Sequence, residues 1–360
     1  MTKLLFVLLL SGCTVFGTLP DEKYRKRFKS SPNYDKKEEV FLNRKPRIVK
    51  DLRKDGFTFA VIKEWFQKGI ERVPEKKLPE VKPDLAQFMK LGPDIKVIWF
   101  GHSTFLLNLQ GKIILVDPVF SGSAAPVSFL VKRFQKPVLE LKELPKIDFL
   151  VISHDHYDHL DMESIKFFTK KDVRFLVPLG VGSHLIGWGI KAERITELDW
   201  WGSHQVDGLE FVATPAQHFS GRDGRHQSST LWASWVIKSQ NHKIYFSGDS
   251  GYDTHFKDIG EKYGPFDLAF IENGQYNEKW RSVHLLPEES VKAYFDLKAK
   301  RFFPVHWGMF QLAFHSWDEP ILKLQSAAEV RHINLVSPRL GEVVTVNETY
   351  ENKKWWLMKQ

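Results

Sequence analysis

The chain has 360 residues, and its 42% hydrophobic and 14% aromatic content suffices for a sizeable core, which excludes a chain that is disordered throughout. Lys and Arg number 52 against 44 Asp and Glu, a formal net charge of +8 that favours anionic partners. The positive charge is scattered, so we expect no nucleic-acid partner. The only cysteine is Cys13, which excludes an intrachain disulfide and a cysteine cage for zinc.

The N-terminus has the layout of a secretory signal. Lys3 is followed by an apolar run over residues 4–10 and by small residues, and seven apolar residues are too few to span a bilayer as a helix. The ending Leu-Ser-Gly-Cys13 resembles the bacterial lipobox, in which the cysteine is lipidated after cleavage. We therefore expect a signal peptide over residues 1–12 and a bacterial cell-envelope protein held on a membrane through lipidated Cys13. The alternative is a short buried helix with a cysteine there by chance.

The next segment is polar and then helical in pattern. Residues 13–54 are predicted to be a lipid-anchored polar tether, either lying near anionic lipid head groups or simply solvated. Residues 55–94 are predicted to be a helical extension, because Phe57–Arg72 carries apolar residues close to helical spacing and three prolines break the pattern after residue 72. The apolar face of this helix is expected either to pack on the rest of the protein or to touch a membrane.

From residue 95 the pattern changes to short apolar runs that are typical of β-strands. Helical patterns intervene at Met162–Lys170, Tyr252–Tyr263, Pro287–Leu297 and Asp318–Val330. This alternation predicts two packed sheets with helices outside, over residues 95–348, followed by a tail over 349–360. The tail residues 353–357 could contact a membrane interface or dock on the domain. The strand-like runs lie at 96–100, 104–109, 112–117, 148–153, 174–178, 209–215, 231–239, 242–248, 268–274, 301–307, 333–337 and 342–346.

The strongest chemical signal comes directly after the run at 148–153. His154, His156, Asp158 and His159 lie within six residues, and imidazole and carboxylate groups suit zinc and similar divalent ions. The alternative is a solvated turn, but packing so many titratable groups together without a cation costs repulsion and desolvation.

The pattern His-x-His-x-Asp-His resembles the signature of the metallo-β-lactamase superfamily, whose four-layer αββα sandwich is an α/β (α+β) fold. That resemblance spans roughly Val97 to Val346 and implies further ligands at strand ends, for which His218, Asp249 and His306 stand in the right order. It implies that two ions, most simply Zn²⁺ with Fe or Mn not excluded, are bound per chain. One ion is then held by His154, His156 and His218. The other is held by Asp158, His159 and His306, and Asp249 bridges both.

Longer flanking motifs are similar to N-acylphosphatidylethanolamine-hydrolysing phospholipase D and its bacterial relatives. They lie at Trp99–Thr104, Asp117–Phe120, Glu197–Trp201, Pro215–His218, His284–Glu289 and His306–Gly308. This resemblance implies a phosphodiesterase that cleaves a membrane phospholipid and so meets a membrane surface. The alternatives are another hydrolase of the same fold, such as a lactonase or a soluble phosphodiesterase, and a metal-binding lipoprotein without catalysis.

The same resemblance implies roles in the reaction. We predict Asp158, Asp249 and His284 as catalytic residues, the first two through the metals and His284 as a leaving-group acid or a residue that supports the ligands; the alternative for His284 is a capping or packing residue. Proton transfer by Asp155 is another option. Three other residues are expected nearby: His102 in a mainly structural role, Tyr157 at a phosphate oxygen or supporting a ligand, and Asp117 orienting a ligand.

Overall fold

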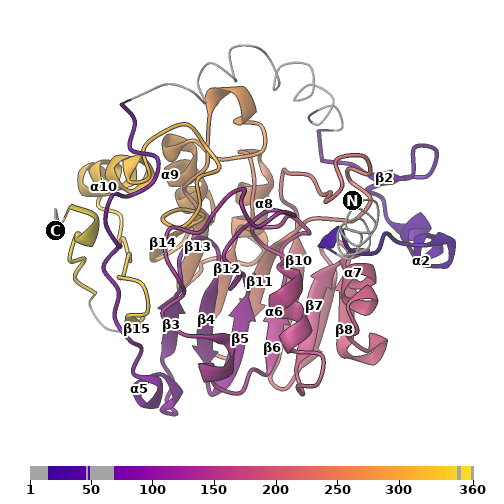
Figure 1. Ribbon diagram of the computed structural model, residues 1–360, viewed down its shortest axis with the longest axis horizontal. Helices are drawn as coiled ribbons and strands as arrows, with labels where there is room; N and C mark the ends of the chain where they lie inside the picture. Colours follow the sequence, from indigo (N-terminus) through magenta and orange to yellow (C-terminus); the bar gives the residue numbers. More distant parts are fainter. Residues whose placement is uncertain (1–14, 46–47, 49–68, 347–349, 358–360) are drawn as a thin grey trace, which may run out of the picture.

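The computed structural model describes residues 15–45, 48, 69–346 and 350–357. Within them the first sheet has seven strands in the order β15-β3-β4-β5-β6-β7-β8 (Figure 1). The pairs from β15 to β5 are antiparallel, and those from β5 to β8 are parallel. The strands are β3 (Ile95–Trp99), β4 (Phe105–Leu109), β5 (Lys112–Val116), β6 (Phe149–Val151), β7 (Arg174–Pro178), β8 (Ile195–Leu198) and β15 (Val343–Thr345).

The second sheet has six strands within the same residues, in the order β14-β13-β12-β11-β10-β9. Strands β12, β13 and β14 are parallel, and the remaining pairs are antiparallel. The connectivity makes β10, β12, β13 and β14 run in one direction, so their carboxyl ends share one edge of the sheet. The strands are β9 (Ser203–Val206), β10 (Leu209–Thr214), β11 (Ser234–Lys238), β12 (Lys243–Phe246), β13 (Leu268–Glu272) and β14 (Phe302–Val305).

The two sheets pack face to face through the apolar inner face of the first sheet. The outer face of that sheet is apolar as well and is covered by a second core. Along β4 and β5, Phe105, Leu107 and Ile114 belong to the core shared with the second sheet, whereas Leu106 and Leu115 belong to a second core on the outer face. The predicted layered sandwich is confirmed, with helices outside the sheets (Figure 1). The helices of this region are α5 (Leu85–Met89), α6 (Met162–Phe167), α7 (Val181–Gly187), α8 (His255–Lys262), α9 (Pro287–Asp296) and α10 (Glu319–Arg331), with short 3₁₀ turns at η2 (Leu141–Glu143), η3 (Ala192–Arg194) and η4 (Glu278–Trp280).

Several elements differ from the sequence-based prediction. Each of the four predicted helices forms but is somewhat shorter or shifted in range. For example, α6 already ends at Phe167. The run at 333–337 makes only a bridge pair, Leu335 with Phe302. Strands β8 and β9 and helix α7 were missed, because β8 and β9 are only partly buried and carry no clear apolar alternation.

The N-terminal segment, expected to be a flexible tether, is folded over residues 15–45. It contains α2 (Glu22–Lys26), η1 (Arg27–Ser30), β1 (Tyr34–Asp35) and β2 (Val40–Phe41). Phe28, Tyr34 and Phe41 are buried and belong to the core between the sheets, with ring centroids 5.0–5.5 Å apart. The prediction of a polar tether is wrong over these residues, because burial of three aromatic side chains fixes the segment against the domain.

Other predictions fall outside the described residues. These are the signal peptide over 1–12, Cys13 and most of the helix at Phe57–Arg72, so the proposed domain boundaries stay predictions. Among the described helices, none has the length and apolar character needed to cross a bilayer. The tail is docked: Trp355 and Trp356 of η5 (Trp355–Leu357) are buried, and Trp355 stacks on Trp307 at 5.3 Å.

Candidate metal centre

The candidate site lies where both sheets present the carboxyl ends of parallel strands. His102 follows β3, Asp117 follows β5, and the segment 154–159 follows β6. The second sheet contributes residues after β10, β12 and β14, and the last residue of β13. Because these strand ends face one another across the sandwich, side chains far apart in sequence converge. All seven predicted ligands meet in two adjoining groups of potential metal-binding atoms, and a third group within the described residues, Asp249, His284 and His306, overlaps both.

The first group consists of His154, His156, His218 and Asp249, whose ligand atoms all lie within 4.8 Å of one another. His156 Nδ1 is 2.9 Å from His154 Nε2 and 3.1 Å from His218 Nε2. Tetrahedral coordination at a zinc–nitrogen distance of about 2.0–2.1 Å places ligand nitrogens about 3.3 Å apart. The three imidazoles are therefore spaced as ligands of a single ion.

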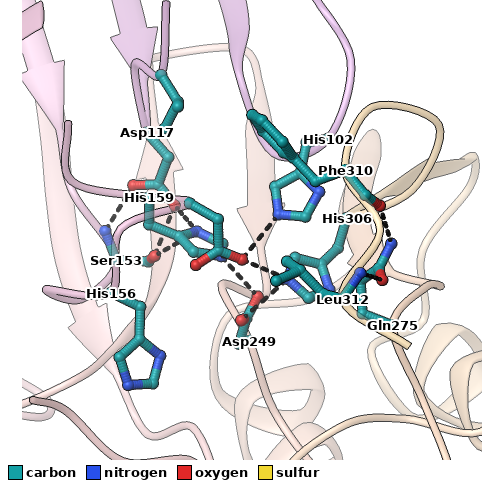
Figure 2. Close-up of polar contacts among 12 residues, drawn as sticks. His102, Asp117, Ser153, His156, His159, Asp249, Gln275, His306, Phe310 and Leu312 are labelled. Atoms are coloured by element: carbon teal, nitrogen blue, oxygen red, sulfur yellow. Dashed lines mark hydrogen bonds and ion pairs between the residues drawn. The ribbon is translucent and has the colours of Figure 1, made fainter. Parts of the chain in front are cut away.

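The second group consists of His102, Asp158, His159 and His306. Asp158 Oδ2 lies 3.0 Å from His102 Nε2, 3.4 Å from His159 Nε2 and 3.3 Å from His306 Nε2. The two loops that carry His102 and His306 are locked together, since the N–H of each residue donates to the carbonyl of the other loop. Figure 2 shows His102 and His306 next to each other on the same side of His159, and their ring centroids lie 4.2 Å apart.

Asp249 stands between the two groups. Its Oδ1 lies 3.1 Å from His159 Nε2, and its Oδ2 lies 3.1 Å from His306 Nε2. The same Oδ2 is 3.7 Å from both His154 Nε2 and His218 Nε2. Asp249 Oδ1 and His159 Nε2 are buried atoms without a hydrogen-bond partner, which is the state expected of atoms that a cation joins. This position fits a carboxylate shared by two ions.

In three of the candidate histidines, the other ring nitrogen is held in the way metal ligands require. His154 Nδ1 lies 2.9 Å from Ser153 Oγ, His218 Nδ1 donates to the carbonyl of Val283 at 3.0 Å, and His306 Nδ1 lies 3.3 Å from the carbonyl of Gly274. Such contacts fix the ring and leave the remaining nitrogen lone pair for a metal. The residues present therefore fit a pair of divalent cations.

The charges of the site also call for cations. Burial lowers the pKa of His154 and of His218 well below the usual value, so these imidazoles are neutral. Burial also lowers the pKa of His306, but the Asp249 and Asp158 carboxylates outweigh it and raise that pKa to about 10. The carboxylate side of the site thus holds protons where no metal is bound, and divalent cations would replace them.

Asp117 orients His159, as the sequence predicted. Its Oδ2 accepts from His159 Nδ1 at 2.7 Å and from Ser153 Oγ at 2.6 Å, and its Oδ1 accepts from Ser153 N at 2.8 Å (Figure 2). Asp117 is fully buried behind the site. It acts on the metal centre through His159 and does not face the ions itself.

His284 lies at the mouth of the site and is held by a residue that the sequence did not reveal. Its Nδ1 lies 2.5 Å from Oε1 of Glu272, which is completely buried at the end of β13. Glu272 Oε2 also accepts from Ser250 N at 2.6 Å. The His284 ring stacks at 5.2 Å on His306, one of the candidate ligands. A lone buried Glu in an apolar strand gave no sequence signal for this partnership.

The loop that carries the first four ligands is pinned from below. Arg222 donates to the carbonyls of Asp155 and Leu160 at 2.6 and 2.8 Å. Tyr157 donates to the carbonyl of Arg222 at 2.6 Å and stacks under its guanidinium, which favours the supporting role for Tyr157. Asp155 accepts from Gly221 N and pairs with His184; these bonds overcome the effect of burial and hold its pKa below the usual range. Asp155 is thus a structural anion and not a proton carrier.

Comparison with known proteins places this geometry in a family. Residues 112–307, more than half of the chain, match the model of the β-lactamase superfamily domain. The chain belongs to the metallo-β-lactamase superfamily. It is therefore a metal-dependent hydrolase of that superfamily, and its His and Asp clusters are compatible with divalent metal.

Individual relatives extend this result. An uncharacterized protein of Mycobacterium tuberculosis is 40% identical over 91% of this chain and 87% of its own length. The N-acyl-phosphatidylethanolamine-hydrolyzing phospholipase D 1 of Caenorhabditis elegans is 35% identical over 68% of this chain and 74% of its own. Among solved structures, Igni18, a metallo hydrolase of the archaeon Ignicoccus hospitalis, superposes with a TM-score of 0.55 at 22% identity, covering 72% of this chain and 100% of that one.

Proposed function

We propose that this chain is a two-metal phosphodiesterase that acts on N-acylphosphatidylethanolamine-type phospholipids with phospholipase D regiochemistry. The observation that carries the proposal is the 35% identity, over 68% of this chain, to a relative named for that activity. The paired ligand groups, with Asp249 between them, supply the machinery that phosphodiester cleavage needs. We take Zn²⁺ as the native metal because the ligands are imidazoles and carboxylates at tetrahedral spacing.

The proposed reaction breaks the bond between phosphorus and the oxygen of the acylethanolamide. The residues around Asp249 would hold two divalent ions, which would supply activation of water and neutralisation of charge on the phosphoryl oxygens. The leaving oxygen needs a proton, and we assign its delivery to His284. Because Nδ1 of His284 is engaged by Glu272, Nε2 is the nitrogen left for the substrate. Glu272 keeps the imidazole oriented through this contact.

We also propose that lipidated Cys13 holds the site close to a membrane in the bacterial cell envelope. Val15, two residues beyond Cys13, accepts a hydrogen bond from Arg222 Nη2 at 2.9 Å. Arg222 is the residue that pins the loop carrying four candidate ligands. An anchor at Cys13 would thus leave little free chain between lipid and site. Replacing Cys13 by Ser is expected to release the protein from the membrane fraction and to abolish labelling with a fatty-acid probe; retention with labelling would refute the anchor.

Turnover of two phosphodiesters by the purified, zinc-loaded full chain tests the activity. Bis(p-nitrophenyl) phosphate reports phosphodiester chemistry, and N-acylphosphatidylethanolamine in mixed micelles reports the lipid reaction. In water enriched in oxygen-18, mass spectrometry should find the label in phosphatidic acid and none in the acylethanolamide, because water attacks phosphorus.

Asp249→Asn is the matched control, since it keeps the size of the side chain but removes the shared charge. Turnover of both substrates by the wild type and loss of both in the control would support the proposal. Hydrolysis of lactones or simple esters without phosphodiester turnover would overturn it and leave the superfamily assignment intact.

A further inference from the structure

Asn43, in the segment that the sequence presents as a tether, contacts a candidate metal ligand directly. Its Nδ2 donates to the carbonyl of His218 at 2.7 Å, and its Oδ1 accepts from the N–H of His218 at 3.0 Å. The two residues are 175 positions apart, and the Asn43 side chain is buried. One carboxamide thus satisfies both backbone groups of His218.

These bonds matter because His218 lies beyond the sheet. The ladder between β10 and β11 ends at Thr214, four residues earlier, so strand pairing does not hold the backbone of His218. A buried peptide N–H or carbonyl that loses its hydrogen-bond partner keeps the full cost of its desolvation. The carboxamide of Asn43 therefore fixes the peptide from which the His218 imidazole projects, while Val283 fixes the ring through Nδ1.

Asn43 is itself held firmly on both sides. Phe41, two residues earlier, is buried in the core, and its N–H donates to the carbonyl of Ser228 at 2.8 Å. On the other side, Arg44 pairs with Asp258 at 2.8 Å and Lys45 pairs with Asp253 at 2.9 Å. A side chain between a buried aromatic anchor and two ion pairs is preorganised for its partner.

We propose that Asn43 is a positioning residue for the metal ligand His218, which makes the segment 15–45 part of the metal centre. The inference rests on the proposed metal centre. A carboxamide is the group that offers one donor and one acceptor side by side. An aspartate would set a second oxygen against the carbonyl of His218, where Nδ2 now stands. Loss of such an outer partner typically lowers metal affinity by about 10–100-fold.

The test is metal binding by the full chain with Asn43→Asp and Asn43→Ala. Zinc per chain is measured by elemental analysis after dialysis, and affinity by competition with a chromophoric chelator. We expect the wild type to hold two ions and each variant to hold one tightly, with the second ion, at His154, His156 and His218, bound about 10–100-fold more weakly. Cobalt substitution, followed by the visible absorption of each site, identifies which ion is weakened.

Asn33→Ala is the matched control, because Asn33 lies on the same segment but its amide faces Asp199 at 3.4 Å. It is expected to keep two tightly bound ions. If both Asn43 variants fail to fold, Asn43→Ser, whose hydroxyl can replace one of the two hydrogen bonds, is expected to fold and show an intermediate loss. Wild-type affinity for both ions in a folded Asn43 variant would overturn the inference while leaving the metal centre in place. A wild type that binds no metal would overturn both.

Discussion

Replacing Asp117 by Asn should weaken metal binding although Asp117 does not face the metals. The carboxylate accepts three hydrogen bonds, two from Ser153 and one from His159 Nδ1. A carboxamide has one oxygen, so its NH₂ group must oppose either the N–H of Ser153 or Nδ1 of His159. The second arrangement would move the imidazole proton to Nε2, the nitrogen that lies 3.1 Å from Asp249 and is needed as a lone pair for the ion.

We expect Asp117→Asn to lower the affinity for the ion near His159 by about 10–100-fold, which corresponds to about 1.4–2.7 kcal/mol. Chelator competition measures this change, and the zinc-dependent rise in melting temperature should shrink accordingly. Asp148→Asn is the control, since Asp148 accepts from Ile113 N at 2.8 Å at the opposite end of β5. If the metal affinities of Asp117→Asn and Asp148→Asn agree within about threefold, Asp117 does not set the tautomer of His159.

Three further predictions test other parts of the argument. Asp249→Asn should cut bound zinc to at most one ion per chain and lower turnover by at least about 100-fold; two retained ions by elemental analysis would contradict the bridging role. Glu272→Gln should lower kcat by about 10–100-fold with both ions retained, since His284 loses the carboxylate that holds its Nδ1. An unchanged kcat would show that Glu272 and His284 take no part in the reaction. Phe28→Ala should lower the free energy of unfolding in denaturant by about 3–5 kcal/mol. A decrease under about 0.5 kcal/mol would instead indicate that the N-terminal segment is only loosely attached.

The seven residues predicted as metal ligands from the family resemblance are brought together in the structure because each lies at or shortly after a strand end. His154 and Asp249 directly follow the apolar runs at 148–153 and 242–248, whereas His218 lies three residues after the run at 209–215 and His306 lies inside the run at 301–307. Parallel strands bring such ends to a common edge, so position along the chain becomes position in space.

The supporting residues could not be predicted, because their partners are remote in sequence and follow no spacing rule. Asn43 and Glu272 each stand alone in the sequence, and only the fold brings them to His218 and His284. Residues 15–45 are rich in charge, which suggested a tether, yet three buried aromatic side chains pack this segment against the domain. Charged residues on the exposed side of a docked segment mask the signal of the few buried ones.

The exposure of the site residues determines from which side a substrate must approach. The side chains of His154, His159, His218, His306 and Asp249 are 0–2% exposed. Those of Asp158 and His284 are 12% and 15% exposed, and His156 is also partly exposed, so these three residues mark the solvent-accessible part of the site. Under the proposed reaction, a phosphodiester that reaches the metals past these residues would bring its leaving oxygen close to His284. Access and proton supply therefore coincide at the same rim, which the positions of the metal ligands alone would not require.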